Sequence, residues 1–221
     1  MNRKILNVSL YIWMAFALLS AIFILFPQID LYVSSLFFED GLFIYNRTWL
    51  EELFFYSVQP LVILFSVIVL AIFTYNTLKK KNILNINKQI VLYILLTLTL
   101  APGLIVNKTL KDNWGRARPK QIIEFGGNKE FTPAFIRSDQ GGYSFSSGHT
   151  AAAFSLMGFV VLASRRRKVW MALALSYGVS VSIARIAAGG HFLSDTVTSF
   201  FIVYISTSIL YLIIFKKELN Q

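Results

Sequence analysis

The chain has no cysteine and few charged residues. Of its 221 residues 14% are charged and 11 are acidic, whereas 56% are hydrophobic. The absence of cysteine excludes disulfides and thiolate metal ligands. The shortage of charge, with apolar residues gathered into long runs, excludes an ordinary soluble domain. The sequence therefore predicts an integral membrane protein that forms a single domain over residues 1–221.

The long apolar runs predict an all-α fold. Most of them approach the roughly 20 residues that a helix needs to cross a hydrocarbon core. The fourth run is short because a polar cluster precedes it and "SRRRK" (164–168), which we interpret as a tight turn, follows it. We expect six transmembrane helices, at about 7–26, 57–78, 90–110, 149–164, 169–188 and 194–215.

The basic residues predict the orientation of these helices. A net charge of +10 could indicate a nucleic-acid partner. Twelve of the 21 basic residues, however, lie in four stretches that six alternating crossings place on one face: the N-terminus, 79–88, 165–168 and the C-terminus. By the positive-inside rule this face is cytoplasmic. The basic excess then reflects topology, and no nucleic-acid partner is expected. We expect the first apolar run to be retained; a cleaved signal peptide is the alternative.

Two stretches fall on the outer face. Residues 27–56 interleave aromatic with acidic residues, which favours short amphipathic helices at the interface. Residues 111–148 begin with "KDNWGRARP", which supplies Lys111, Arg116 and Arg118. Interfacial cations beside lipid would be an ordinary interpretation. Positive charge on the outer face opposes the orientation rule, however, and this favours an anionic ligand.

A second polar cluster, "SFSSGHTAAAF" (144–154), stands directly before an apolar helix. Ser147 can cap that helix, Gly148 allows close backbone approach, and His149 occupies the first turn. The free N–H groups of a helix start favour an anion. An incidental histidine after an ordinary cap is the alternative.

A third cluster, "ARIAAGGHFLSD" (184–195), contains an arginine at the outer end of the fifth run. Such an intramembrane charge is costly and is usually functional. His191 and Asp195 are four residues apart, so on a helix they share a face, and the carboxylate can accept from the Nδ1–H of the imidazole. A capping pair or two metal ligands are alternatives, but we see no further ligands placed to complete a metal site, and none is expected.

The predicted topology brings the three clusters to the same outer membrane face. Together they offer basic side chains, a helix N-terminus and two histidines, one of which is supported by a carboxylate. This combination is typical of a phosphate site that has a nucleophile and a general acid.

At these residues the sequence resembles the type 2 phosphatidic acid phosphatases, which are related to the vanadium haloperoxidases. That family carries Lys-x6-Arg-Pro, Pro-Ser-Gly-His and Ser-Arg-x5-His-x3-Asp. The chain matches with Lys111 and Arg118–Pro119, with Ser147–Gly148–His149, and with Arg185, His191 and Asp195. It departs at two supporting positions, where Ser146 replaces the usual proline and Ala184 the usual serine.

The resemblance implies a role for each matched residue. His191 is the nucleophile, Asp195 orients it, and His149 is the acid and then the base. Lys111, Arg118, Ser147, Gly148 and Arg185 bind phosphate, and Arg116, outside the family spacing, is a possible secondary contact. Neither a metal nor a cofactor is expected.

The membrane setting indicates a lipid substrate. More narrowly, the chain resembles the lipid A phosphatases of Gram-negative bacteria that act at the 4′ position, which implies an inner-membrane enzyme with a periplasmic site. Eleven aromatic residues of the two outer stretches, among them Tyr32, Trp49, Phe125, Tyr143 and Phe145, could contact sugar rings. They could equally form an interfacial belt.

Several alternatives stay open at this point. Undecaprenyl diphosphate and phosphatidylglycerol phosphate are competing substrates. A lipid flippase would place its ionisable groups along a path through the membrane, whereas here they gather at one end. A vanadate-dependent oxidase would use the same anion pocket, but a multispan membrane chain disfavours it.

Overall fold

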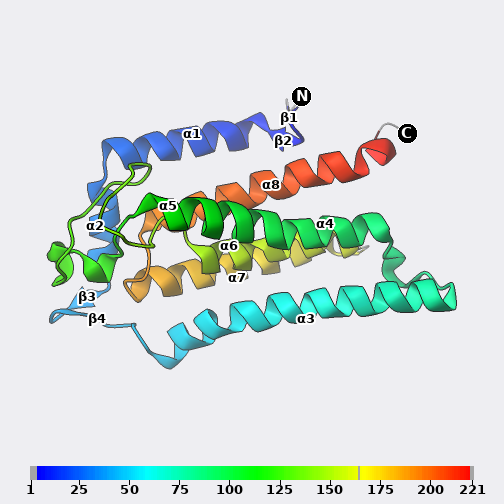
Figure 1. The fold of residues 1–221 in the computed structure, drawn as a ribbon, viewed down its shortest axis with the longest axis horizontal. Coiled ribbons are helices and arrows are strands. Elements are labelled where there is room, and N and C mark those ends of the chain that lie inside the picture. Colours follow the sequence, from blue (N-terminus) through cyan, green and yellow to red (C-terminus); the bar gives the residue numbers. More distant parts are fainter. Residues whose placement is uncertain (1–3, 164, 220–221) are drawn as a thin grey trace.

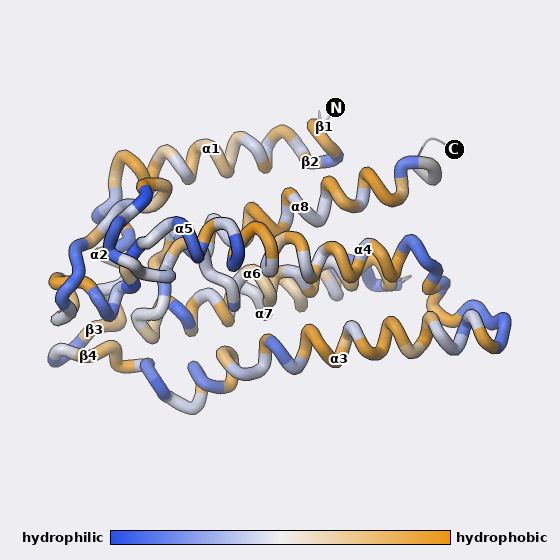
Figure 2. Tube along the Cα trace, in the orientation of Figure 1, coloured by the Kyte–Doolittle hydropathy of each residue, from blue (hydrophilic) through white to orange (hydrophobic). Residues whose placement is uncertain are grey.

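Long helices run alongside one another in the computed structural model, which describes residues 4–163 and 165–219. They are α1 (Leu10–Leu25), α3 (Trp49–Lys79), α4 (Lys88–Thr99), α7 (Arg167–Ala187) and α8 (Leu193–Leu219). Figure 1 shows both termini toward the same end as the α3–α4 connection, with α2 (Gln28–Ser35) at the other end. Hydrophobic residues follow the helices, and hydrophilic residues gather at the two ends (Figure 2). Arg3 and Ser164, which belong to predicted basic stretches, lie outside the described residues.

The prediction of an all-α membrane protein is confirmed. Among the residues that the structure describes, four helical stretches are long and apolar enough to cross a membrane: Trp49–Lys79, Lys88–Trp114, Arg167–Ala187 and Leu193–Lys216. A fifth is added if α1 and α2, which meet at 85°, count as one span. The fourth predicted crossing forms only a short helix, α6 (Gly148–Ser155), followed by the 3-10 helix η5 (Leu156–Leu162). Length and composition thus support four or five spans, and six crossings stay a prediction.

The outer stretch 27–56 differs from the expectation of separate interfacial helices. Only α2 is a separate short helix. "WLEELFFY" forms the first turns of α3, because the side chain of Thr48 accepts a hydrogen bond from the Glu51 N–H and starts the helix there. Between them, β3 (Phe38–Glu39) pairs with β4 (Leu42–Phe43) in an antiparallel hairpin, with Phe38 opposite Phe43. Its turn residues, Asp40 and Gly41, both have positive φ, as an Asp-Gly hairpin turn requires.

Helix α4 continues through a π-helical stretch, η2 (Leu100–Lys111), into the short α5 (Asp112–Trp114). Pro102 has no N–H to donate within this stretch, and wide turns of this kind are frequent near functional sites. Lys111 is the last residue of η2. The remaining short elements are β1 (Lys4–Ile5), which pairs with β2 (Val8–Ser9), and the 3-10 helices η1 (Ile83–Asn85), η3 (Pro119–Gln121) and η4 (Ile123–Phe125).

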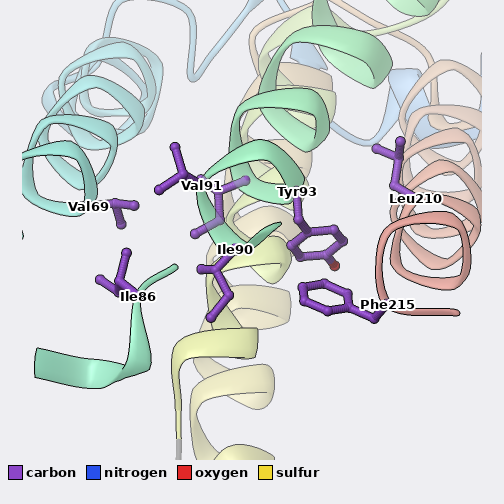
Figure 3. Packing of buried hydrophobic residues seen from close by; sticks show 8 residues of the cluster. Val69, Ile86, Ile90, Val91, Tyr93, Leu210 and Phe215 are labelled. Carbon is purple, nitrogen blue, oxygen red and sulfur yellow. The ribbon is translucent and has the colours of Figure 1, made fainter. Parts of the chain in front are cut away.

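Two buried clusters hold the long helices together. One joins α3, α4 and α8 near the basic connections, where the rings of Tyr93 and Phe215 meet edge to face at 5.7 Å (Figure 3). The other joins η2, α6 and α8 and includes Val106, Ala151 and Val203. Association of helices in lipid depends on close van der Waals packing, which small residues permit. A Cβ on Gly178 would lie 2.3 Å from the Phe154 ring, so glycine allows α6 and α7 to approach.

Candidate active site

A pocket of about 260 Å³ lies among the residues of the outer stretches. It brings together five of the predicted site residues, which come from all three sequence clusters: Lys111, Arg118, His149, Arg185 and His191. The other lining residues are Asn46, Arg47, Glu51, Glu52, Phe55, Tyr56 and Lys120. Sequence reasoning thus identified much of the lining but missed the contribution of α3 and of the loop before it.

Ser147 and Gly148 lie next to the lining residue His149 rather than in the lining itself. The Ser147 hydroxyl caps α6 by accepting from the Thr150 N–H at 3.4 Å, as predicted from the sequence. A Cβ on Gly148 would lie 2.4 Å from Oδ1 of Asn107. Glycine is therefore needed for the start of α6 to pack against η2, which places His149 close to Lys111.

Cations outnumber anions in the pocket lining, which contains five basic residues and the two acidic residues Glu51 and Glu52. The ion pairs found among residues 4–163 and 165–219 involve neither Lys111 nor Arg118. Burial lowers the pKa of Arg118 and of Lys120, and the pKa of Lys120 is lowered further by the charges of Arg118 and Arg185. A bound anion would relieve this repulsion, so the electrostatics favour an anionic ligand.

Arg185 is held in place by two α3 residues that the sequence analysis did not identify as site residues. Its Nη1 lies 2.6 Å from Oε1 of Glu51, and both side chains are almost fully buried. Its guanidinium lies 4.7 Å from the Phe55 ring, which also stacks on His149 at 4.2 Å. Within the described chain, Nε of Arg185 is buried without a hydrogen-bond partner and so can still donate. The signal in the sequence that could have identified Glu51 and Phe55 was Thr48. As an N-cap it starts α3 at Trp49, so both residues belong to the helix that borders the site.

His191 has a defined tautomer because of a backbone carbonyl. Its Nδ1 lies 2.8 Å from the carbonyl oxygen of Ser144 and 3.6 Å from Oδ2 of Asp195. The predicted hydrogen bond from Nδ1 to Asp195 is therefore not formed, because Nδ1 is directed to the Ser144 carbonyl instead. A carbonyl oxygen only accepts, so Nδ1 carries the proton and Nε2 carries the lone pair. Burial lowers the pKa of His191 to about 4, although Asp195 opposes this shift, and the ring is neutral at pH 7.

Asp195 is fully buried and accepts hydrogen bonds on both oxygens. Oδ1 accepts from Nη1 of Arg116 at 2.6 Å, and Oδ2 accepts from the Ser144 hydroxyl at 2.6 Å and from the Phe192 N–H at 2.8 Å. Arg116, expected as a possible secondary phosphate contact, is also fully buried and is absent from the lining. The reason is that two carboxylates, Asp195 and Asp30, hold its guanidinium away from the pocket.

No group of three histidine, aspartate or glutamate side chains within 4–163 and 165–219 could hold a metal ion. Whether the reaction needs a metal is a matter for experiment, and independence from metal stays a prediction.

Comparison with known proteins agrees with this geometry. The model of the PAP2 superfamily matches residues 90–219, which include every residue of the three sequence clusters. A lipid A 4′-phosphatase of Francisella tularensis subsp. novicida (strain U112) is 32% identical over 202 residues, covering 89% of this chain and 90% of that protein. A lipid A 4′-phosphatase of Rhizobium leguminosarum is 37% identical over 106 residues, covering 46% and 45%. No solved structure matches the chain significantly.

Proposed function

Because the chain belongs to the PAP2 superfamily of phosphatases, we propose that it removes the 4′-phosphate of lipid A. The names of its relatives support this substrate, since the alignment with the Francisella protein spans nearly the whole of both chains. We place the enzyme in the bacterial inner membrane with six crossings, cytoplasmic termini and a periplasmic active site. The concentration of basic residues in the stretches at one end of the bundle supports that orientation.

The observation that carries the mechanism is the tautomer of His191. With Nδ1–H directed to the Ser144 carbonyl, the lone pair of Nε2 is available to attack phosphorus. An N–P bond forms while the bond from phosphorus to the 4′ oxygen of the lipid breaks. His149, which must start this step protonated, gives its proton to the departing oxygen and becomes neutral. In the second step His149 takes a proton from water, the water oxygen attacks the phosphohistidine, and inorganic phosphate and neutral His191 are released.

Charge that develops on the phosphoryl oxygens is balanced by the surrounding cations. Lys111, Arg118 and Arg185 line the pocket and donate to these oxygens. The Ser147 hydroxyl and the Gly148 N–H, at the start of α6, complete the set of donors. Phosphoryl transfer depends mainly on such positioning and charge balance, so a pocket with this composition suits the reaction.

The aromatic residues offer less support for a sugar substrate than the sequence indicated. Phe125 and Phe145 are buried in the protein and cannot contact a lipid headgroup. Tyr32, Trp49 and Tyr143 are exposed and remain available. The substrate proposal therefore rests on the relatives and on the pocket rather than on an extended aromatic surface.

Purified protein in detergent tests the substrate. Phosphate release should be much faster from lipid A than from phosphatidic acid, phosphatidylglycerol phosphate or undecaprenyl diphosphate, and mass spectrometry of the product should locate the loss at the 4′ position. His191→Asn, which keeps a polar side chain of similar size, is the matched inactive control. Equal or faster turnover of either of the last two lipids would refute the lipid A assignment. Loss of the 1-phosphate would refute the position.

Reporter fusions test the proposed topology. A reporter inserted near residue 128 should be extracytoplasmic, and one fused after Lys168 should be cytoplasmic. The reverse result would refute the periplasmic site. A fusion after Lys168 that lies on the same side as residue 128 would refute the short fourth crossing alone.

A further inference from the structure

Behind His191 lies a buried charge network that the proposed mechanism does not use. Arg116 donates from Nη2 to Oδ2 of Asp30 at 2.8 Å and from Nη1 to Oδ1 of Asp195 at 2.6 Å. Its Nε donates to the Thr132 carbonyl at 2.8 Å. Arg116, Asp30 and Asp195 are each 0–1% exposed. One guanidinium thus bridges two buried carboxylates, only one of which belongs to a family motif.

The second carboxylate, Asp30, also fixes the start of α8. Its Oδ1 accepts from the Ser194 N–H at 2.9 Å, and its Oδ2 accepts from the Ser194 hydroxyl. Ser194 precedes Asp195 in the first turn of α8, where N–H groups lack helical partners. Asp30 therefore caps, from α2, the turn that carries Asp195.

The backbone places Arg116 beside Ser144, the residue that contacts both His191 and Asp195. The Ser144 N–H donates to the Arg116 carbonyl at 3.0 Å, and the Gly142 N–H donates to the Gly115 carbonyl at 2.8 Å. Ser144 contacts Asp195 through its hydroxyl and His191 through its carbonyl. The Arg116 guanidinium also lies 4.3 Å from the Phe192 ring, between His191 and α8. Arg116 thus contacts Asp195 through its side chain and Ser144 through its backbone, and these are the two residues that face Nδ1 of His191.

We propose that Asp30 and Arg116 are positioning residues of the reaction, which together keep Asp195 ionised and hold its Oδ2 toward His191. The inference rests on the proposed phosphohistidine chemistry, in which a positive charge develops on His191. The positive charge of the Arg116 guanidinium is shared between the two carboxylates. Because Asp30 takes part of that charge, Asp195 is not fully neutralised and keeps negative charge for His191.

The charge balance predicts a specific response to mutation. The charged groups that act on Asp195 are Arg116 and Arg118 from the loop after α5, His191 before α8, and Asp30 from α2. Without the guanidinium, Asp30 and Asp195 would face one buried volume as like charges. Two such carboxylates hold one proton between them, so Asp195 would share a single negative charge with Asp30 and would no longer be a fixed anionic partner of His191.

The experiment compares Arg116→Gln, Asp30→Asn and the double variant, measuring kcat and KM across pH with the lipid that the wild type hydrolyses fastest. Arg137→Gln is the matched control, since Arg137 is exposed and donates to a backbone carbonyl in the same outer region. Thermal unfolding in detergent shows whether each variant is folded. Arg116→Lys, which keeps the charge but loses the planar fork, provides a second measurement.

Arg116→Gln should lower kcat by about 10²-fold, the size of effect that misplacement by 1 Å can have, and shift the acid limb of activity to higher pH. KM should change little, because Lys111, Arg118 and Arg185 keep their positions. Removal of the second carboxylate in the double variant should restore kcat at least tenfold over Arg116→Gln. Arg116→Lys should lower kcat without moving the acid limb, and Arg137→Gln should match the wild type.

A purely structural role predicts other results. The double variant would then be no more active than Arg116→Gln, and the acid limb would stay in place. Either result, or wild-type kcat in Arg116→Lys, would overturn the inference. Failure of the proposed function would be seen in the wild type, which would then release phosphate from no lipid. Failure of the present inference would be seen only in the variants, with an active wild type.

Discussion

Gly190 offers the sharpest test of the phosphate-binding role of Arg185. A Cβ at position 190 would lie 2.3 Å from Nη2 and 2.9 Å from Cζ of Arg185. Ordinary van der Waals contact begins near 3.4 Å, so in Gly190→Ala the guanidinium must retreat by about 1 Å, a displacement that can cost 10²-fold in rate. The backbone of Gly190 does not need a positive φ, so alanine acts through this contact.

We therefore expect kcat/KM of Gly190→Ala to fall by about 10²-fold, equivalent to roughly 2.7 kcal/mol of transition-state stabilisation. Phosphate release from lipid A in mixed micelles measures it. Gly103→Ala is the matched control, because a Cβ there has no neighbour within 4 Å, and it should match the wild type. The thermal midpoint of Gly190→Ala should stay close to that of the wild type, because the far end of a side chain moves rather than the backbone.

A double-mutant cycle identifies the path of the effect. In an Arg185→Ala background the added methyl group has no guanidinium to displace, so Gly190→Ala should cause no further loss. A further tenfold loss would show that the methyl group acts elsewhere, for example on the Arg185 carbonyl, which is 3.2 Å away. Wild-type kcat/KM in the single variant would refute the reasoning altogether.

Three further predictions concern the chemistry. His191→Ala should abolish phosphate release and His149→Ala should lower kcat by about 10²–10⁴-fold, measured as single-turnover rates. Burial lowers the pKa of His191 to about 4, so its nucleophilic form prevails above that value, and a pH series should show kcat/KM falling as the pH drops through about 4. Activity should fall again on the alkaline side, because His149 must carry a proton to act as the acid. Activity should survive dialysis against chelator, and vanadate should inhibit it; a strict requirement for a divalent metal would contradict the assigned roles.

The sequence predicted which polar residues lie together better than it predicted the boundaries of the helices. The spacing of the three motifs sufficed to name Lys111, Arg118, His149, Arg185 and His191, and the structure brings all five to one pocket. The agreement has a physical reason: charged residues are costly in an otherwise apolar chain, so those that are present tend to gather at one place. The cap of α6 by Ser147 was also predictable, because its hydroxyl acts on a residue three positions away.

Contacts between distant residues could not be predicted in this way. Asp30 and Arg116 are 86 residues apart, and Glu51 and Arg185 are 134 apart. The sequence placed Asp30 in an amphipathic interfacial segment, where an acidic residue is unremarkable. Only the 85° bend between α1 and α2 brings it to the start of α8.

The length of α3 illustrates a related limit. Hydropathy placed the start of the second predicted crossing at residue 57, because Glu51 and Glu52 are acidic and stand in an aromatic interfacial pattern. A buried ion pair removes the conflict: Arg185 neutralises Glu51, so the helix can carry that carboxylate inward and bring Phe55 against His149. An isolated carboxylate at this depth would be costly, whereas a paired one is tolerated and can serve the site.

The same pairing bears on how Arg185 is positioned for the proposed anion. Arg185 is attracted to Glu51 on one side, while its Nε is buried without a partner among the described residues. Glu51 therefore keeps the guanidinium in place but leaves a donor unused, and under the proposed function that donor would gain a partner when phosphate binds. A guanidinium fixed in advance loses little side-chain entropy on binding, so more of the interaction energy is available to the developing charge of the transition state. Glu51 of α3 thus positions the guanidinium, whereas Arg185 of α7 supplies the charge. The two helices contribute separately to one proposed phosphate contact.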